Sequence, residues 1–299
     1  MTILKQALLL LSFAAATLAQ EQPPTSVLVS ITNKSGYPPE VELRDRLQVT
    51  ADKQLAKVIS VEQAVDLQVH IAILIDRSGR PTQLVNREQE AATAFLNRFA
   101  RPESDRAFMM DVAQGQPNLT TIHNQADLRA ALSRRSNVAG DVLLDALKSY
   151  VAEVEKRFGT KFPSRRAIIL FSNGGVQVGQ DFVPKVREYL IRNRITIFVV
   201  NTDWTWRLLA TNSASLMQEL AEDTGGTFEE PPGGATQGTP INDQQFPDIL
   251  NHMGAVVRNQ FLLTYQTLRP QPKLYPLDVR ALDASLMLHA PRYGIAGQP

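Results

Sequence analysis

The sequence predicts an α/β fold with a doubly wound, mostly parallel sheet, helices on both faces, and a small β module. Three observations predict it. Nearly continuous apolar runs, typical of strands buried on both faces, occupy residues 69–75, 167–171 and 195–200. Segments with apolar residues at helical spacing alternate with these runs. Strand-like segments bounded by turn residues occupy the first and last parts of the chain, and they predict the β module.

Composition and pattern divide the chain into five parts. They are a signal peptide (1–19), an N-terminal β module (26–66), the α/β domain (67–230), a Pro/Gly-rich loop (231–245) and a C-terminal helix with strands (246–299). Because the edges of sheets need partners, we expect the C-terminal strands to pair with the N-terminal module.

The first residues predict export. Lys5 supplies the positive charge of a signal peptide, residues 7–16 its apolar region, and Thr17-Leu18-Ala19 a cleavage site. The apolar stretch is too short to span a bilayer comfortably, so we expect no membrane span after its removal; an uncleaved signal anchor is the alternative. The absence of cysteine excludes disulfides and a lipoprotein anchor. Together these features favour a bacterial envelope protein, periplasmic or secreted.

The elements follow in order. In the N-terminal module, strands are predicted at 27–32, 47–49 and 57–61. In the α/β domain, strands are predicted at 69–75, 106–112, 119–122, 167–171, 195–200 and from 227, and helices at 86–99, 126–132, 142–158, 182–192 and 214–223. Asn124 is suited to cap the second of these helices, and Gly225 and Gly226 to close the last. A helix at 246–258 and strands at 260–265 and 277–281 complete the chain.

The charge of the chain is balanced. It contains 31 Lys and Arg and 30 Asp and Glu. The signal peptide holds one of these residues, Lys5, so the exported chain is close to neutral. This balance argues against bulk electrostatic capture of nucleic acid or anionic lipid.

Polar residues follow the three buried runs. Asp76, Ser78 and Arg80 come after the first run, Asn173 after the second and Trp204 after the third. Ligands of open α/β sheets bind outside the carboxyl ends of the strands. These residues therefore form a candidate binding rim, on which Trp204 is suited to anchor a partner or to close over the core.

At these residues the chain resembles the von Willebrand factor type A (VWA) domain, in its exported acidobacterial-type branch. The resemblance covers most of the exported chain, including Leu47-Gln48-Val49, the segment 220–226 and the segment 259–265. It implies a Rossmann-like sheet and a role in protein interaction.

The resemblance also implies a metal-ion-dependent adhesion site, which this sequence alters. The family motif Asp-x-Ser-x-Ser reads Asp76-Arg77-Ser78-Gly79-Arg80, so Arg80 replaces the second serine. Asp141 stands where a threonine is expected, and Asn173 where an aspartate is expected. Only Asp76 and Ser78 keep the family's oxygen ligands for Mg²⁺.

These changes suggest a metal-free site without a cofactor. A guanidinium cannot bind a metal, but it is a permanent cation with forked donors. The hypothesis is that Arg80 replaces the metal charge and pairs with Asp141, Asp76 or both, while Asn173 supplies neutral hydrogen bonds. In one alternative, Asp76, Ser78 and Asp141 still hold a cation and Arg80 turns outward. In the other, the site has decayed and Arg80 is a solvated surface residue.

The sequence therefore predicts an exported, non-enzymatic module that binds a protein or peptide at this rim. The alternatives are a structural component of an envelope assembly with a vestigial site, and a divalent-cation-dependent adhesion domain. No nucleotide-binding glycine motif and no Gly-x-Ser-x-Gly elbow is present. His70, His123, His252 and His289 show no metal-ligand spacing, and each is predicted to be a lone structural or surface residue.

Overall fold

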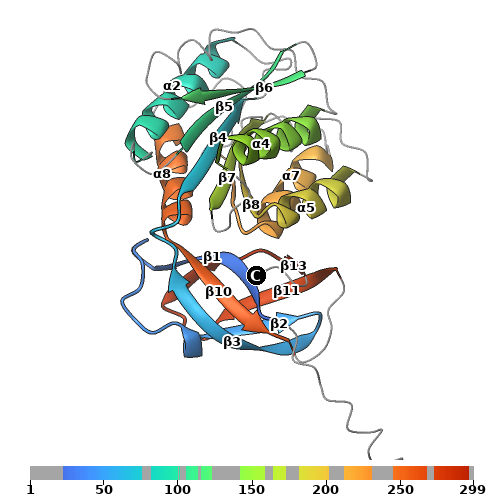
Figure 1. Cartoon of the computed structure of the whole chain (residues 1–299). Helices are drawn as coiled ribbons and strands as arrows, with labels where there is room; N and C mark the ends of the chain where they lie inside the picture. Colours follow the sequence, from blue (N-terminus) through green and yellow to red (C-terminus); the bar gives the residue numbers. More distant parts are fainter. Residues whose placement is uncertain are drawn as a thin grey trace, which may run out of the picture.

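The computed structural model describes residues 23–75, 82–99, 101, 106–113, 116–122, 142–158, 164–172, 182–201, 212–230, 245–267 and 273–295. These residues form an α/β domain stacked on a β module (Figure 1). The β module contains β1 (Thr25–Asn33), the short 3₁₀ helix η1 (Arg44–Arg46), β2 (Leu47–Ala51), β3 (Gln54–Gln63), β10 (Gln260–Gln266), β11 (Leu274–Ala281), β12 (Leu286–His289) and β13 (Tyr293–Ile295).

The α/β domain lies between these two groups of strands along the chain. It contains β4 (Val69–Ile75), α2 (Thr82–Phe99), β5 (Arg106–Ala113), β6 (Gln116–Ile122), α4 (Val142–Phe158), β7 (Arg165–Ser172), α5 (Phe182–Arg192), β8 (Ile195–Asn201), α7 (Asn212–Asp223), β9 (Phe228–Glu229) and α8 (Gln245–Arg258). The predicted helix at 126–132 and most of the predicted loop at 231–245 lie outside the described residues. Within the described part of the chain, no helix is long and apolar enough to cross a membrane.

The sheet of the α/β domain has the strand order β6-β5-β4-β7-β8-β9. Each neighbouring pair from β5 to β9 is parallel, and β6 runs antiparallel to β5 at one edge. All residues of β4 and β8 are buried, as the continuous apolar runs require of central strands. The predicted α/β fold is confirmed.

Helices cover both faces of this sheet (Figure 1). Ile71 and Ile73 of β4 share one core with α2 and α8, including Phe95 and Met253. The alternate residues of β4 share the opposite core with α4, α5 and α7. This division follows from the period of a strand, because successive side chains point to opposite faces.

The β module interleaves the two ends of the chain. Its strands lie in the order β12-β1-β10-β3-β2-β11-β13, and neighbouring strands are antiparallel. Strand β10 lies between β1 and β3, with Val29 opposite Phe261 and Val61 opposite Leu263. Neither end of the chain forms this core alone, since buried residues come from β1, β2, β3, β10 and β11 together.

A buried arginine stands where the chain passes between the two modules. Arg165, at the start of β7, is 1% exposed. Its guanidinium donates to the carbonyl of Leu67, in the connection from β3 to β4, and to that of Val257, near the end of α8. Both passages of the chain between the modules are thus held by one side chain.

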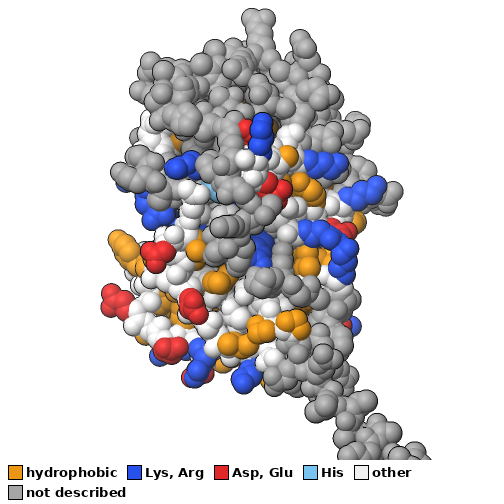
Figure 2. All heavy atoms as spheres, viewed as in Figure 1, with side chains coloured by type: hydrophobic (Ala, Val, Ile, Leu, Met, Phe, Trp, Pro, Cys, Tyr) orange, Lys and Arg blue, Asp and Glu red, His pale blue; other side chains and the backbone are white. Residues whose placement is uncertain are grey.

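Charged side chains are mixed on the surface. On the face in Figure 2, Lys and Arg are interspersed with Asp and Glu over the described parts of both modules. This distribution agrees with the balanced charge of the sequence.

Candidate functional site

The carboxyl ends of the central strands meet at one edge of the sheet. In the parallel register, Ile75 of β4 lies opposite Phe171 of β7, and Ser172 of β7 lies opposite Asn201 of β8. The three strands therefore end within about one residue of one another. Asp76 follows β4 directly in the chain, and Asn173 follows β7 directly.

The strand order reverses at this edge. Numbered along the chain, the six strands of the sheet lie in the order third, second, first, fourth, fifth, sixth. The connections leave toward opposite sides from β4 and β7, which are adjacent. Such a reversal leaves a crevice outside the strand ends, where open α/β sheets bind their ligands.

The six predicted rim residues, Asp76, Ser78, Arg80, Asp141, Asn173 and Trp204, lie outside the described residues. The described elements beside them are the ends of β4, β7 and β8 and the start of α4, whose first residue follows Asp141 in the chain. The proposed pairing of Arg80 with Asp141 or Asp76 therefore stays a prediction.

Helix α4 is fixed to the sheet by a buried hydroxyl. The hydroxyl of Tyr150 donates to the backbone carbonyl of His70 at 2.7 Å. Burial raises the pKa of Tyr150 well above its ordinary value, so this hydroxyl keeps its proton. The bond and the packing of Leu147 against the sheet set the position of the helix.

The edge also holds polar residues that the sequence analysis did not assign to the site. Ser172 and Asn201 are 1% and 3% exposed. The amide Nδ2 of Asn201 donates to Oε1 of Glu230 at 3.0 Å. Glu230 directly follows β9, which extends the parallel sheet beyond β8. The sequence predicts a strand from residue 227, and Glu230 follows that strand. The parallel pairing of this strand with β8, which brings Glu230 to Asn201, was not visible in the sequence.

Two of the four histidines, each predicted to be a lone structural or surface residue, lie beside each other in the structure. The rings of His252, on α8, and His289, on β12, lie 6.1 Å apart between centroids in an edge-to-face arrangement. Nδ1 of His252 lies 2.8 Å from Oε1 of Glu229. Among the described residues, no three His, Cys, Asp or Glu side chains are arranged to hold a metal ion.

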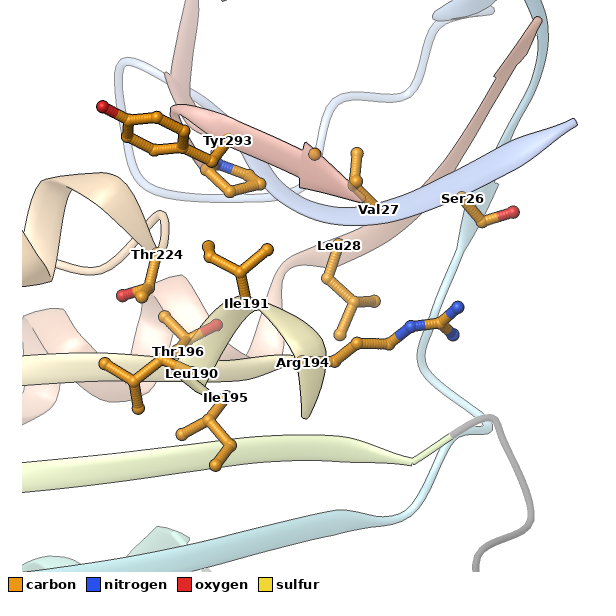
Figure 3. Close-up of a pocket in the computed structure, with 12 residues that line it drawn as sticks. Ser26, Val27, Leu28, Leu190, Ile191, Arg194, Ile195, Thr196, Thr224 and Tyr293 are labelled. Carbon is orange, nitrogen blue, oxygen red and sulfur yellow. The ribbon is translucent and has the colours of Figure 1, made fainter. Parts of the chain in front are cut away.

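A pocket lies between the modules at the opposite, amino-terminal end of the sheet (Figure 3). Leu28 of β1 approaches Ile191 of α5 across it, and Arg194 stands at its side. Burial and the neighbouring Arg166 lower the pKa of Arg194 to about 10. The lining is mainly apolar, and the position of the pocket separates it from the predicted rim.

Comparisons with known proteins give no sequence family. No family model matches the chain, and no curated protein matches it. Among solved structures, the chain is similar to the SpRpn10 VWA domain, with 13% identity over 62% of this chain and 94% of that one, at a TM-score of 0.45.

Two further similar structures come from a bacterium and a mussel. BatB from Bacteroides thetaiotaomicron is 13% identical over 64% of this chain and 99% of that one, at a TM-score of 0.42. Proximal thread matrix protein 1 from the mussel byssus is 10% identical over 77% of this chain and 51% of that one, at a TM-score of 0.44. Since likenesses at this level define neither family nor function, the strand order and register carry the interpretation below.

Proposed function

We propose that this chain is an exported, non-enzymatic VWA-type module that binds a protein or peptide at the carboxyl edge of its doubly wound sheet. The observation that carries this proposal is the reversal of strand order between β4 and β7. It puts the natural crevice of the fold beside the two strand ends that Asp76 and Asn173 follow.

The proposed rim contains acidic residues that need a compensating positive charge. Asp76 follows β4, Asp141 precedes α4, and Glu230 follows β9. Carboxylates near one another repel, and either a cation or a guanidinium offsets this repulsion. Two basic residues follow Asp76 closely. Arg77 occupies a variable position of the family motif, whereas Arg80 replaces the second serine, which is a metal ligand in the family. We therefore assign the compensating charge to Arg80 and propose a metal-free rim.

A rim of this composition suits a polar ligand. The guanidinium of Arg80 offers forked donors that match a carboxylate, and Asn173 offers both a donor and an acceptor. Trp204 adds an aromatic surface of the kind that anchors protein partners. Binding through these groups requires no nucleophile, which supports a role without turnover.

Capture of partners from an envelope extract tests this proposal. Wild-type protein and Arg80→Ala are immobilised and exposed to extract of the source organism, and the bound proteins are identified by mass spectrometry. Arg98→Ala is the matched control, because Arg98 is an exposed arginine on α2. We expect Arg80→Ala, but not Arg98→Ala, to lose the partners that wild type retains. If Arg80→Ala and Arg98→Ala retained the same partners as wild type, the proposal that partners bind at this rim would be contradicted.

Calorimetry with Mg²⁺, Mn²⁺ and Ca²⁺ separates the metal-free rim from a cation-dependent one. A metal-free rim gives no binding heat with any of the three ions. A micromolar isotherm that Asp141→Ala abolishes would show that the acidic residues hold a cation, and that Arg80 does not replace it.

A further inference from the structure

We propose that His252, Glu229 and His289 form a proton-dependent contact between the modules. The contact holds the modules together most tightly when one of the two histidines is protonated and the other is neutral. The contact is a conformational device built into the fold, and it does not depend on what binds at the predicted rim. The contact loosens both when this proton is lost and when a second proton is added.

The three residues come from both modules. His252 lies on α8 and Glu229 on β9, both in the α/β domain, whereas His289 is the last residue of β12 in the β module. The ring of His252 contacts both the carboxylate of Glu229 and the ring of His289. Side chains of His252 and Glu229 are 47% and 27% exposed, so protons from solvent reach the group.

His289 also belongs to a polar row that faces the α/β domain. Across the β module, Ser30 lies opposite His289 on one side and opposite Gln260 on the other. Residues directly opposite on neighbouring strands share a face. Gln260 marks that face, because its Nε2 lies 3.5 Å from Oγ1 of Thr196 in the α/β domain.

This row adds buried polar groups to the boundary between the modules. Ser30 and Gln260 are 2% and 4% exposed, and neither Ser30 Oγ nor Gln260 Oε1 has a hydrogen-bond partner within the described part of the chain. Buried polar atoms of this kind are typically satisfied by water. A boundary built in this way separates at lower cost than a continuous apolar core.

The charges around the two histidines favour one proton. The hydrogen bond to Glu229 raises the pKa of His252, against the opposing effect of burial. Burial, followed by the charge of His252, lowers the pKa of His289. Among the described residues, Glu229 is the other charged group that acts on His289, and it raises the pKa of His289. Between the two pKa values, His252 is therefore charged and His289 is neutral.

These two pKa shifts determine how the strength of the contact changes on the alkaline and on the acidic side, which are called its alkaline arm and its acidic arm below. As pH rises through the raised pKa of His252, the ion pair with Glu229 that holds the His252 ring in place is lost, and the contact of this ring with His289 weakens. As pH falls through the ordinary histidine range toward the lowered pKa of His289, a second imidazolium forms beside the first and repels it. The strength of the contact therefore passes through a maximum near the ordinary histidine pKa.

A second contact between the modules limits the extent of opening. Nη2 of Arg292, between β12 and β13, lies 2.6 Å from Oε2 of Glu222 on α7. The backbone amide of Arg292 also donates to the carbonyl of Asp223 at 3.0 Å. These bonds hold one side of the boundary while the histidine side opens, so the expected motion is a small rotation and not dissociation.

Fluorescence energy transfer between two labels tests the proposal. The natural chain contains no cysteine, so Glu90→Cys on α2 and Ala284→Cys near β12 carry the labels uniquely. Both positions are exposed. From about pH 5 to about pH 8, transfer is expected to pass through a maximum and to fall on both sides. A transfer efficiency that is constant over this range would overturn the proposal.

Variants identify the groups responsible. His289→Gln is expected to lose the acidic arm and keep the alkaline arm. Glu229→Gln is expected to flatten the alkaline arm, and its matched control, Glu230→Gln, to leave both arms in place because Glu230 pairs with Asn201. Should His289→Gln fail to fold, the comparison of Glu229→Gln with Glu230→Gln still decides. Identical profiles for these two variants would refute the role of the histidine contact.

Discussion

The guanidinium of Arg165 donates two hydrogen bonds to the backbone carbonyl of Leu67, from Nη2 at 2.8 Å and from Nε at 3.1 Å. The same guanidinium reaches the carbonyl of Val257 at 3.1 Å through Nη1. Leu67 precedes β4, and Val257 is next to the last residue of α8. One side chain therefore satisfies carbonyls of both segments that connect the modules.

Arg165→Met is expected to lower the free energy of unfolding by about 3 kcal/mol, because it leaves buried carbonyls without donors. Arg165→Lys should recover only part of this loss, since an ammonium lacks the forked geometry. Urea denaturation followed by circular dichroism measures both. The matched control is Arg98→Met at an exposed position of α2, with an expected change within about 0.5 kcal/mol. Equal effects at positions 165 and 98 would contradict this role of Arg165.

The buried tyrosines predict loss of stability at alkaline pH. The hydroxyls of Tyr265 and Tyr275 lie 2.7 Å apart in the core of the β module. Burial raises the pKa of both above the ordinary value of 10.0. The unfolded chain then releases these protons before the folded chain does, so stability falls as pH rises past the ordinary value.

Tyr265→Phe isolates this effect. It should cost about 1–2 kcal/mol at neutral pH, because the hydroxyl of Tyr275 loses a partner. It should also reduce the slope of stability against pH above the ordinary tyrosine pKa, measured by urea denaturation at a series of pH values. Tyr37→Phe is the control, because Tyr37 is 67% exposed. A slope that is unchanged in Tyr265→Phe would exclude Tyr265 as a source of the alkaline transition.

Gly226, between α7 and β9, permits a close contact of this segment with β8. A Cβ at this position would lie 1.9 Å from the carbonyl oxygen of Ile197, which is backbone and has no room to move. Gly226→Ala is therefore expected to cost more than about 3 kcal/mol or to prevent folding. In Gly36→Ala the same added methyl meets nothing within 4 Å, and only the positive φ of 81° opposes it. We expect that control to cost about 1 kcal/mol, measured by thermal denaturation. Similar costs in the two variants would mean that backbone conformation, and not this contact, requires Gly226.

Local pattern was sufficient to predict most elements of the α/β domain. The apolar run at 69–75 coincides with β4, and the helix predicted at 142–158 coincides with α4. A strand buried on both faces has few alternatives in sequence, since most of its residues must be apolar. The helix predicted at 86–99 begins earlier, at Thr82. Leu84 and Val85 precede Ala91 and Ala92 by seven residues, a helical spacing that the prediction did not use.

Contacts between distant segments could not be predicted in this way. Strands β12 and β13 are short, and their pairing with β1 and β11 depends on the assembled module. His252 and His289 are separated along the chain and meet only after α8 and β12 are in place. The site was predicted from the strand ends and, for Asp141, from the resemblance to the VWA domain. The register supports their alignment at Ile75, Ser172 and Asn201, whereas the pairing of Asn201 with Glu230 needed the position of β9.

The contacts of Arg187 lead us to expect that its removal lowers the free energy of unfolding by an amount that depends on pH. Its Nε donates to Oδ2 of Asp223 at 2.5 Å, and its Nη2 contacts the carboxylate of Glu219. Its guanidinium also lies 4.7 Å from the ring centroid of Tyr293, which places it at the boundary with the β module. Burial raises the pKa of Asp223, and Arg187 opposes that rise. Removal of Arg187 therefore leaves a carboxylate, 3% exposed, without its main compensating charge.

Arg187→Ala is expected to cost about 3 kcal/mol at neutral pH, where Asp223 is ionised in the unfolded chain. At about pH 4 the cost should shrink, because Asp223 of the variant is then protonated in the folded state and requires no cation. Urea denaturation at both pH values measures the difference. Arg192→Ala is the control, since Arg192 pairs with Glu188 on the exposed side of the same helix and should cost about 0.5 kcal/mol at neutral pH. A cost for Arg187→Ala that is the same at both pH values would mean that the cation–π contact with Tyr293, and not the charge on Asp223, accounts for its contribution.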